Sequence, residues 1–67
     1  MKIKYDSEVD ILLIELSESE IYESDEPKPG VILDYDKEGN ILRIEILDAS
    51  KRTNTPFKFE YEMVSGD

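Results

Sequence analysis

The sequence contains no cysteine, histidine or tryptophan, and these absences remove several kinds of chemistry at once. Without cysteine there is no disulfide, and without cysteine or histidine the usual ligands of a structural zinc ion are missing. A serine or threonine nucleophile also lacks the histidine base that normally activates it. The three glycines lie far apart, so there is no glycine-rich phosphate loop. We therefore expect a protein that is not an enzyme and holds no cofactor.

Long hydrophobic runs and positive charge are scarce as well. No stretch reaches the roughly 18 apolar residues of a membrane span, and Met1 is followed at once by Lys2 rather than by a secretory core. The 17 acidic residues outnumber the 8 basic ones and give a net charge of -9. Such a surface repels nucleic-acid phosphates and anionic lipid. The composition predicts a cytoplasmic location, no membrane or nucleic acid as partner, and a basic protein as the favoured partner.

Alternation of polar and apolar residues predicts strands in the first half of the chain. Residues 3–6 alternate with a period of two, which is typical of a half-buried strand. Residues 11–16 have apolar side chains at both odd and even positions, which predicts a central strand buried on two faces. Residues 31–35 and 41–47 alternate around a polar turn at 36–40, where glycine and asparagine tolerate positive φ. These two segments are therefore predicted to form a hairpin.

The acidic segment 17–26 has almost nothing to bury, so we expect an exposed edge or loop. Ser17 and Glu20 have the spacing of a capping box, but a helix here would lack an apolar stripe and would stop at Pro27. The prolines and Gly30 that follow predict a bend or bulge. The acidic stretch Glu15 to Glu26 is either a surface for a basic partner or a solubilising edge. Its partner-facing candidates are Glu18, Glu20, Glu23, Asp25 and Glu26.

The C-terminal part is predicted to contain one helical turn near residues 48–54 and a last strand at 57–63, before a frayed tail at 64–67. The last strand places Phe57, Phe59, Tyr61 and Met63 on one face. That face is expected to cover the domain's own core, with a second copy or a partner's groove as alternatives.

The fold predicted for residues 1–67 is one domain that is mostly all-β. It consists of a single antiparallel meander sheet of four or five strands, and α+β with a short helix on one face is the alternative. A core this small supplies only about 3 to 5 kcal/mol, and disulfides and zinc are excluded. Because the strand at 11–16 is apolar on both faces, we expect a homodimer that stacks or continues its sheets.

Several segments also resemble a known family. They are Tyr5-Asp6-x-Glu8-x-Asp10-x-Leu12-x-Ile14, Pro29-Gly30-Val31-Ile32-Leu33-Asp34-Tyr35-Asp36, Gly39, and Ile44-Glu45-Ile46-Leu47-x-Ala49-Ser50. The chain resembles the short prokaryotic YuzE-like domains of unknown function from about Tyr5 to Arg52, although Arg43 stands where such domains often have glycine. The resemblance implies no activity. Some members are encoded beside small toxin-like proteins, which implies an antitoxin role.

One group of acids has the spacing of an EF-hand calcium loop. Asp34, Asp36, Glu38 and Glu45 occupy its acidic positions, and Gly39 occupies its glycine position. The flanking segments look like strands, however, and an extended chain would carry Glu45 roughly 15 to 20 Å from Gly39. Binding of calcium or another hard cation, with Asp34, Asp36 and Glu38 as weak metal candidates, is therefore kept as an alternative to an ordinary acidic hairpin.

A second acidic group, Asp6, Glu8 and Asp10, could converge on a cation or act as an acid/base pair. If Asp6 or Asp10 packed near Asp34, mutual repulsion would raise one pKa. A carboxylate-dependent hydrolase is thus a further alternative. We favour the simpler interpretation, in which these residues form a solvated turn and accept local backbone hydrogen bonds.

Overall fold

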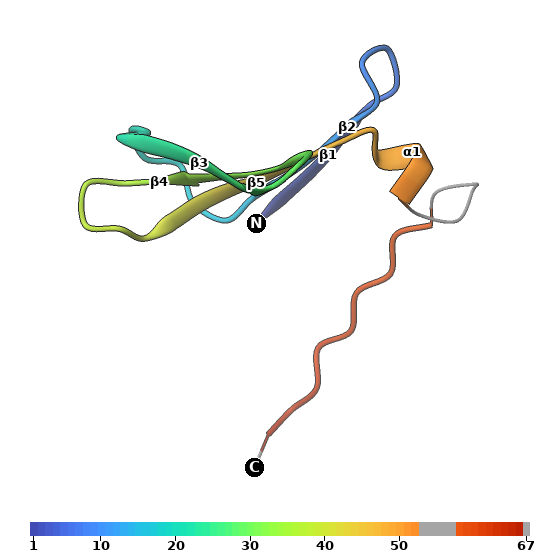
Figure 1. Ribbon diagram of the computed structural model, residues 1–67. Helices are drawn as coiled ribbons and strands as arrows, with labels where there is room; N and C mark the ends of the chain where they lie inside the picture. Colours follow the sequence, from blue (N-terminus) through green and yellow to red (C-terminus); the bar gives the residue numbers. More distant parts are fainter. Residues whose placement is uncertain (53–57, 67) are drawn as a thin grey trace.

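The computed structural model, which describes residues 1–52 and 58–66, contains a five-stranded antiparallel sheet and one short helix (Figure 1). The elements are β1 Lys2–Asp6, β2 Ile11–Glu15, β3 Glu23–Lys28, β4 Val31–Tyr35, β5 Ile41–Leu47 and α1 Ala49–Arg52. The strands predicted at residues 3–6, 11–16, 31–35 and 41–47 therefore form as β1, β2, β4 and β5. The helical turn predicted near residues 48–54 is confirmed as α1.

The strands lie in the order β1-β2-β5-β4-β3, and every neighbouring pair is antiparallel. This confirms a mostly β protein with a single antiparallel sheet. The meander order needs a correction, because β5 lies between β2 and β4 instead of following β4 to an edge. Burial explains the difference: β2 and β5 have the most apolar residues to cover, whereas β3 is exposed along its whole length and takes an edge.

The acidic segment follows its prediction, with a loop that leads into the edge strand β3. The register between β3 and β4 shifts between Asp25 and Lys28, and this bulge accommodates Pro27, which cannot donate to a ladder. Gly30 then turns the chain with a φ of 84°. At the β4–β5 turn the Asp36 carboxylate accepts hydrogen bonds from the backbone N–H groups of Glu38 and Asn40, both at 2.9 Å.

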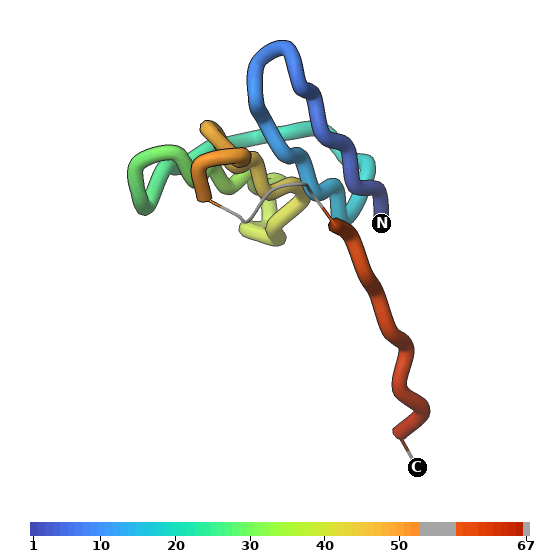
Figure 2. Tube along the Cα trace, turned by 90° about the vertical axis from the view of Figure 1, so that its right-hand side faces the viewer, coloured from blue at the N-terminus to red at the C-terminus, as the bar shows by residue number. Residues whose placement is uncertain are grey.

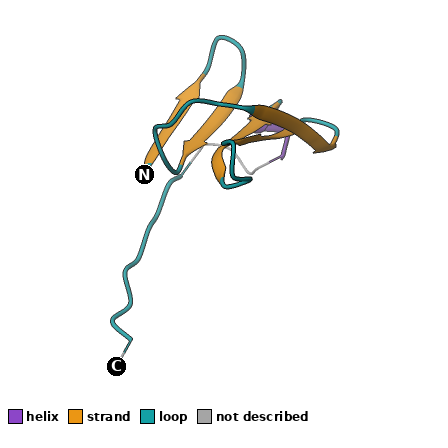
Figure 3. Cartoon of the chain, turned by 90° about the vertical axis from the view of Figure 1, so that its left-hand side faces the viewer, coloured by secondary structure: helices purple, strands orange, loops and turns teal. Residues whose placement is uncertain are grey.

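The register places cross-strand neighbours on two distinct faces. One face, here called the apolar face, contains Ile3, Tyr5, Leu12, Ile14, Val31, Leu33, Ile44 and Ile46. The other, here called the mixed face, contains Lys2, Lys4, Asp6, Ile11, Leu13, Glu15, Ile32, Asp34, Arg43, Glu45 and Leu47. The sheet is a single twisted layer with α1 at one end (Figures 1 and 3).

The core of this single layer is small. Among the described residues only Leu12, Leu42 and Ala49 are buried apolar residues, with exposed fractions of 8%, 2% and 0%. The remaining apolar side chains of the inner strands are mostly half-buried. A one-layer sheet cannot cover both of its faces, and stable architectures normally pack a second layer on the first. No helix in the described part of the chain is long and apolar enough to cross a membrane.

The strand predicted at 57–63 is the main error of the sequence interpretation. Phe57 lies outside the described residues, and residues 58–66, here called the C-terminal arm, belong to no strand and run away from the sheet (Figures 1 and 2). Tyr61 and Met63 are 90% and 89% exposed, so they do not cover the domain's own core. Alternation makes a segment amphipathic, but a strand also needs a neighbour that satisfies its backbone hydrogen bonds.

Candidate functional site

The first cluster of polar groups joins the β1–β2 hairpin to α1 through Asp10. This residue has a φ of 57°, in the left-handed region that aspartate tolerates better than most residues. Its Oδ1 accepts hydrogen bonds from the Tyr5 hydroxyl (2.7 Å) and the Ser50 N–H (2.9 Å), and its Oδ2 accepts one from the Ser50 hydroxyl (2.7 Å). Its backbone carbonyl accepts the N–H of Ala49 at 3.0 Å. We call this arrangement the Asp10 clamp.

The clamp shifts the titration of both acidic groups in it. The Ser50 hydroxyl, together with Tyr5 and the Ser50 N–H, holds the pKa of Asp10 below its ordinary value. The hydrogen bond to the Asp10 carboxylate in turn raises the pKa of Tyr5. The Asp10 carboxylate is therefore charged at neutral pH and already accepts three hydrogen bonds. The arrangement connects α1 to the β1–β2 hairpin.

Sequence reasoning placed Asp10 in a local acidic cluster and missed its partner forty residues away. The donors to Asp10 were expected to be local backbone groups, whereas the clamp connects residues 10 and 50. The signal was present in the resemblance, because its first motif contains both Tyr5 and Asp10 and its last one ends at Ser50. Asp6, another acid of that cluster, accepts the local N–H of Glu8 at 3.0 Å.

The second cluster surrounds Asp34 on the mixed face. Asp34 is only 2% exposed, and it lies opposite Arg43 on β5 and Ser24 on β3. Its carboxylate accepts hydrogen bonds from the Ser24 hydroxyl (2.6 Å) and from Arg43 Nε (3.0 Å). Arg43 Nη2 also lies 3.8 Å from a Glu45 carboxylate oxygen. A buried carboxylate is thus paired and hydrogen-bonded, as its burial requires.

The two carboxyl groups of this cluster titrate in opposite directions. Burial by itself raises the pKa of Asp34, but hydrogen bonds with Glu45, Ser24 and Arg43 outweigh it and lower the pKa overall. A hydrogen bond with the Asp34 carboxylate, followed by partial burial, raises the pKa of Glu45. Asp34 therefore keeps its charge and Glu45 holds a proton more readily. Electrostatic repulsion therefore acts between Asp34 and Glu45, and not between Asp34 and Asp6 or Asp10 of the first hairpin.

The three acids proposed as weak metal candidates serve different purposes. Asp34 is occupied by Ser24 and Arg43, whereas Asp36 closes its own turn and also accepts the Asn40 side-chain amide at 3.0 Å. Glu38 is exposed in the same turn. Across residues 1–52 and 58–66, no group of three or more acidic side chains is arranged to hold a metal ion. Glu45 lies within the extended strand β5, as the sequence analysis predicted for this segment.

The third feature is an exposed acidic surface, residues 18–26, that ends in the edge strand β3. All five partner-facing candidates are exposed, and none of them forms an ion pair with another described residue. Glu26 accepts the N–H of Gly30 at 2.8 Å, which fixes the bulged end of β3. The outer side of β3 pairs with no other described strand. Carboxylates and unpaired backbone groups therefore lie along the same edge.

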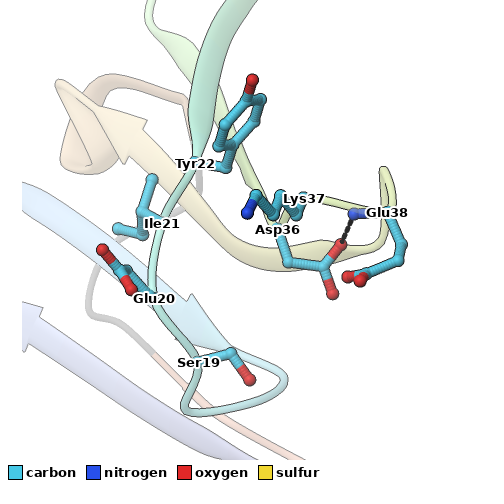
Figure 4. Close-up of a pocket in the computed structure, with 7 residues that line it drawn as sticks. All are labelled: Ser19, Glu20, Ile21, Tyr22, Asp36, Lys37 and Glu38. Carbon is cyan, nitrogen blue, oxygen red and sulfur yellow. Dashed lines mark hydrogen bonds between the residues drawn. The ribbon is translucent and has the colours of Figure 1, made fainter.

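A depression of about 520 Å³ adjoins this acidic surface, between the loop that precedes β3 and the β4–β5 turn (Figure 4). It is lined by Ser19, Glu20, Ile21, Tyr22, Asp36, Lys37 and Glu38. Tyr22 is 66% exposed and Ile21 is 39% exposed. The backbone N–H of Tyr22 donates to the carbonyl of Tyr35 at 2.8 Å, which anchors the loop to β4. Aromatic side chains are enriched in protein interfaces relative to the rest of the surface.

Comparison with known proteins assigns the chain to a family. A family model described as a protein of unknown function (DUF2283) matches residues 2–50. The chain belongs to the DUF2283 family. The matched residues run from β1 to Ser50 and so include both ends of the Asp10 clamp, whereas the C-terminal arm lies outside the DUF2283 match. No curated protein and no solved structure matches the chain. The expected resemblance to a family of unknown function is confirmed at that level.

Proposed function

We propose that this DUF2283 domain is a non-enzymatic protein-interaction module of the prokaryotic cytoplasm that binds a basic protein through its acidic surface. The observation that carries the proposal is the exposed edge at residues 18–26, whose five partner-facing carboxylates have no ion-pair partner among the described residues. Charge of one sign on an exposed edge accelerates encounter with a protein of the opposite charge and sets its orientation.

The edge also offers more than charge. The backbone of β3 has no strand on its outer side among the described residues, so a strand of a basic partner can add to the sheet and place its lysines or arginines against the carboxylates. Tyr22 and Ile21 supply adjacent apolar area. This combination favours the antitoxin-like function that a YuzE-like domain implies, in which a small basic protein is held and neutralised.

The carboxylates inside the sheet support a non-enzymatic function. Asp10 and Asp34 are held by fixed hydrogen bonds from Tyr5, Ser50, Ser24 and Arg43. A general base needs room for a substrate proton within hydrogen-bond reach. The acceptor positions of these two carboxylates are instead used to join elements of the fold.

We further propose that the domain is a homodimer. Three buried apolar residues in the described part of the chain make a small core for one layer, and the half-buried residues on both faces leave further apolar area in contact with solvent. A second chain supplies the missing cover, as many domains of this size require.

A co-expression experiment tests binding of the basic partner. The full chain carries an affinity tag and is expressed with the product of the neighbouring reading frame. We expect the two proteins to purify together, with a complex that weakens as salt is raised because the attraction between surface charges is screened. Glu23→Lys should weaken the complex, whereas the matched control Glu8→Lys, an exposed acid in the β1–β2 turn, should leave it intact. Absence of a complex, or equal loss in the two variants, would contradict the proposal.

A further inference from the structure

The edge formed by β1 differs from the acidic edge formed by β3. Among the described residues β1 pairs only with β2, so one side of its backbone has no neighbouring strand. Lys2, Lys4 and Asp6 lie on the mixed face, and Ile3 and Tyr5 on the apolar face. This edge therefore has two basic residues and one acid on one face, in a chain whose net charge is -9. A strand at the edge of a sheet is a template for another strand.

The C-terminal arm has the same two-sided pattern. Its apolar and charged residues alternate strictly, with Phe59, Tyr61 and Met63 on one side and Lys58, Glu60 and Glu62 on the other. The views from three directions all show the arm leading away from its own sheet (Figures 1, 2 and 3). The Lys58 ammonium lies 2.8 Å from Glu60, but both side chains are largely exposed. Such an ion pair contributes little and is easily exchanged for another.

An antiparallel alignment of the arm with β1 matches every position. The pairs are Lys2 with Glu62, Ile3 with Tyr61, Lys4 with Glu60, Tyr5 with Phe59, and Asp6 with Lys58. Directly opposite residues of antiparallel strands share a face. All the charged pairs are therefore of opposite sign and lie on the mixed face, and the apolar pairs extend the apolar face. No parallel alignment brings Lys58 to Asp6 while it keeps both lysine–glutamate pairs.

The β3 edge does not fit the arm equally well. Its Glu23, Asp25 and Glu26 would repel Glu60 and Glu62, and its bulge at residues 25–28 interrupts a regular ladder. Charge thus selects β1 over β3 as the partner of the arm. The β3 edge stays available for a basic protein.

We propose that the C-terminal arm of each copy pairs antiparallel with β1 of a second copy, which gives a reciprocal, two-fold dimer. The inference rests on the proposed homodimer and names the surface that forms it. Exchange of arms gives β1 a neighbouring strand on its outer side and places Phe59 and Tyr61 beside Tyr5 and Ile3 on the apolar face. It also explains why an alternating segment lies away from its own sheet: the matching edge belongs to the other copy.

Paired charge reversals test the exchange. One variant of the full chain carries Lys2→Glu and Lys4→Glu on β1, and the other carries Glu60→Lys and Glu62→Lys on the arm. Each variant alone places like charges opposite each other, so we expect its dimer dissociation constant to rise at least about tenfold. An equimolar mixture of the two variants restores opposite charges in both exchanged arms of the mixed dimer, and a chain with all four changes restores them in both arms of its own dimer. The chain with all four changes should dimerise like the unmodified protein in sedimentation equilibrium.

A charge-matched variant and a measurement of folding separate this pairing from a general effect of charge and from unfolding. Lys28→Glu with Lys37→Glu gives the same net charge as the β1 variant and should leave dimerisation unchanged. Far-ultraviolet circular dichroism verifies the sheet in each variant, and the arm variant changes only exposed side chains outside the sheet. An unmodified chain that is monomeric would overturn both the homodimer and the arm exchange. A dimer that withstands both reversals, or a four-change chain that dimerises no better than either double variant, would overturn the exchange alone.

Discussion

At the scale of single residues, two aspartates determine how distant parts of the sheet are joined. Asp10 connects the first hairpin to α1, and Asp34 lies buried between β3 and β5 with partners on both. The sequence predicted acidic turns and acidic strand positions, but it did not reveal which donors the folded chain would bring to them. Both residues were considered as functional carboxylates, and both contribute to the fold.

Asp10→Asn should lower the melting temperature by several degrees at pH 7, because the amide replaces a charged acceptor that binds Ser50 and Tyr5. The folded-state pKa of Asp10 is lowered. The stabilisation by Asp10 is therefore complete above its unfolded-state pKa of about 3.9, and it is lost as pH falls through its folded-state pKa. In thermal melts from pH 7 down to about pH 2, the melting temperature should fall less steeply with decreasing pH in this variant than in a Glu8→Gln control. Coincident curves would contradict the clamp.

Glu45→Gln should stabilise the protein at neutral pH by roughly 0.5 kcal/mol, because it removes a negative charge next to the Asp34 carboxylate and keeps a hydrogen-bond donor. The pKa of Glu45 is raised in the folded state. Wild-type stability should thus gain from protonation of Glu45 as pH falls through that raised value, and the variant should lack this gain. Urea unfolding at several pH values measures it. A variant that is less stable than wild type at pH 7 would show that the Arg43–Glu45 attraction dominates.

At the scale of elements, local patterns and long-range placement differ in how well they could be predicted. The alternation at 3–6, 31–35 and 41–47 predicted strands because a half-buried strand must alternate. Strand order was not encoded in the same way, since alternation does not say which apolar strand becomes the neighbour of another. The same pattern gave a wrong prediction at 57–63, where the described residues belong to no strand.

The β3–β4 turn and α1 meet at Gly30, and a substitution there tests their contact. Gly30 has a φ of 84°, and its carbonyl accepts the N–H of Leu47. The Arg52 guanidinium occupies the position that a β-carbon at Gly30 would take, and it donates to the Pro29 and Leu47 carbonyls. Gly30→Ala should cost about 1 to 2 kcal/mol from its left-handed backbone, with a further loss from displacement of Arg52.

Gly39→Ala is a matched control for that change. Gly39 has nearly the same φ of 85°, but nothing in the described part of the chain lies within 4 Å of the position that a methyl group would occupy. Chemical denaturation of the two variants should therefore show a larger loss for Gly30→Ala. Equal losses would mean that the backbone angle accounts for the whole effect and that the Arg52 contact adds nothing.

At the scale of the whole molecule, a single layer with three buried apolar residues among those described is an incomplete architecture. The two edges of the sheet differ in charge, with acids along β3 and lysines on β1. We propose that the β1 edge takes the arm of a second copy and that the β3 edge takes a basic protein. This division was not predictable from composition, because the net charge conceals the basic edge.

Sedimentation equilibrium of the unmodified full chain at micromolar concentration tests most directly whether a second chain completes this sheet. We predict a stable species of twice the chain mass, because the β1 edge of each copy takes the arm of the other. A single species with the mass of one chain, unchanged as the concentration is raised through the micromolar range, would contradict the account.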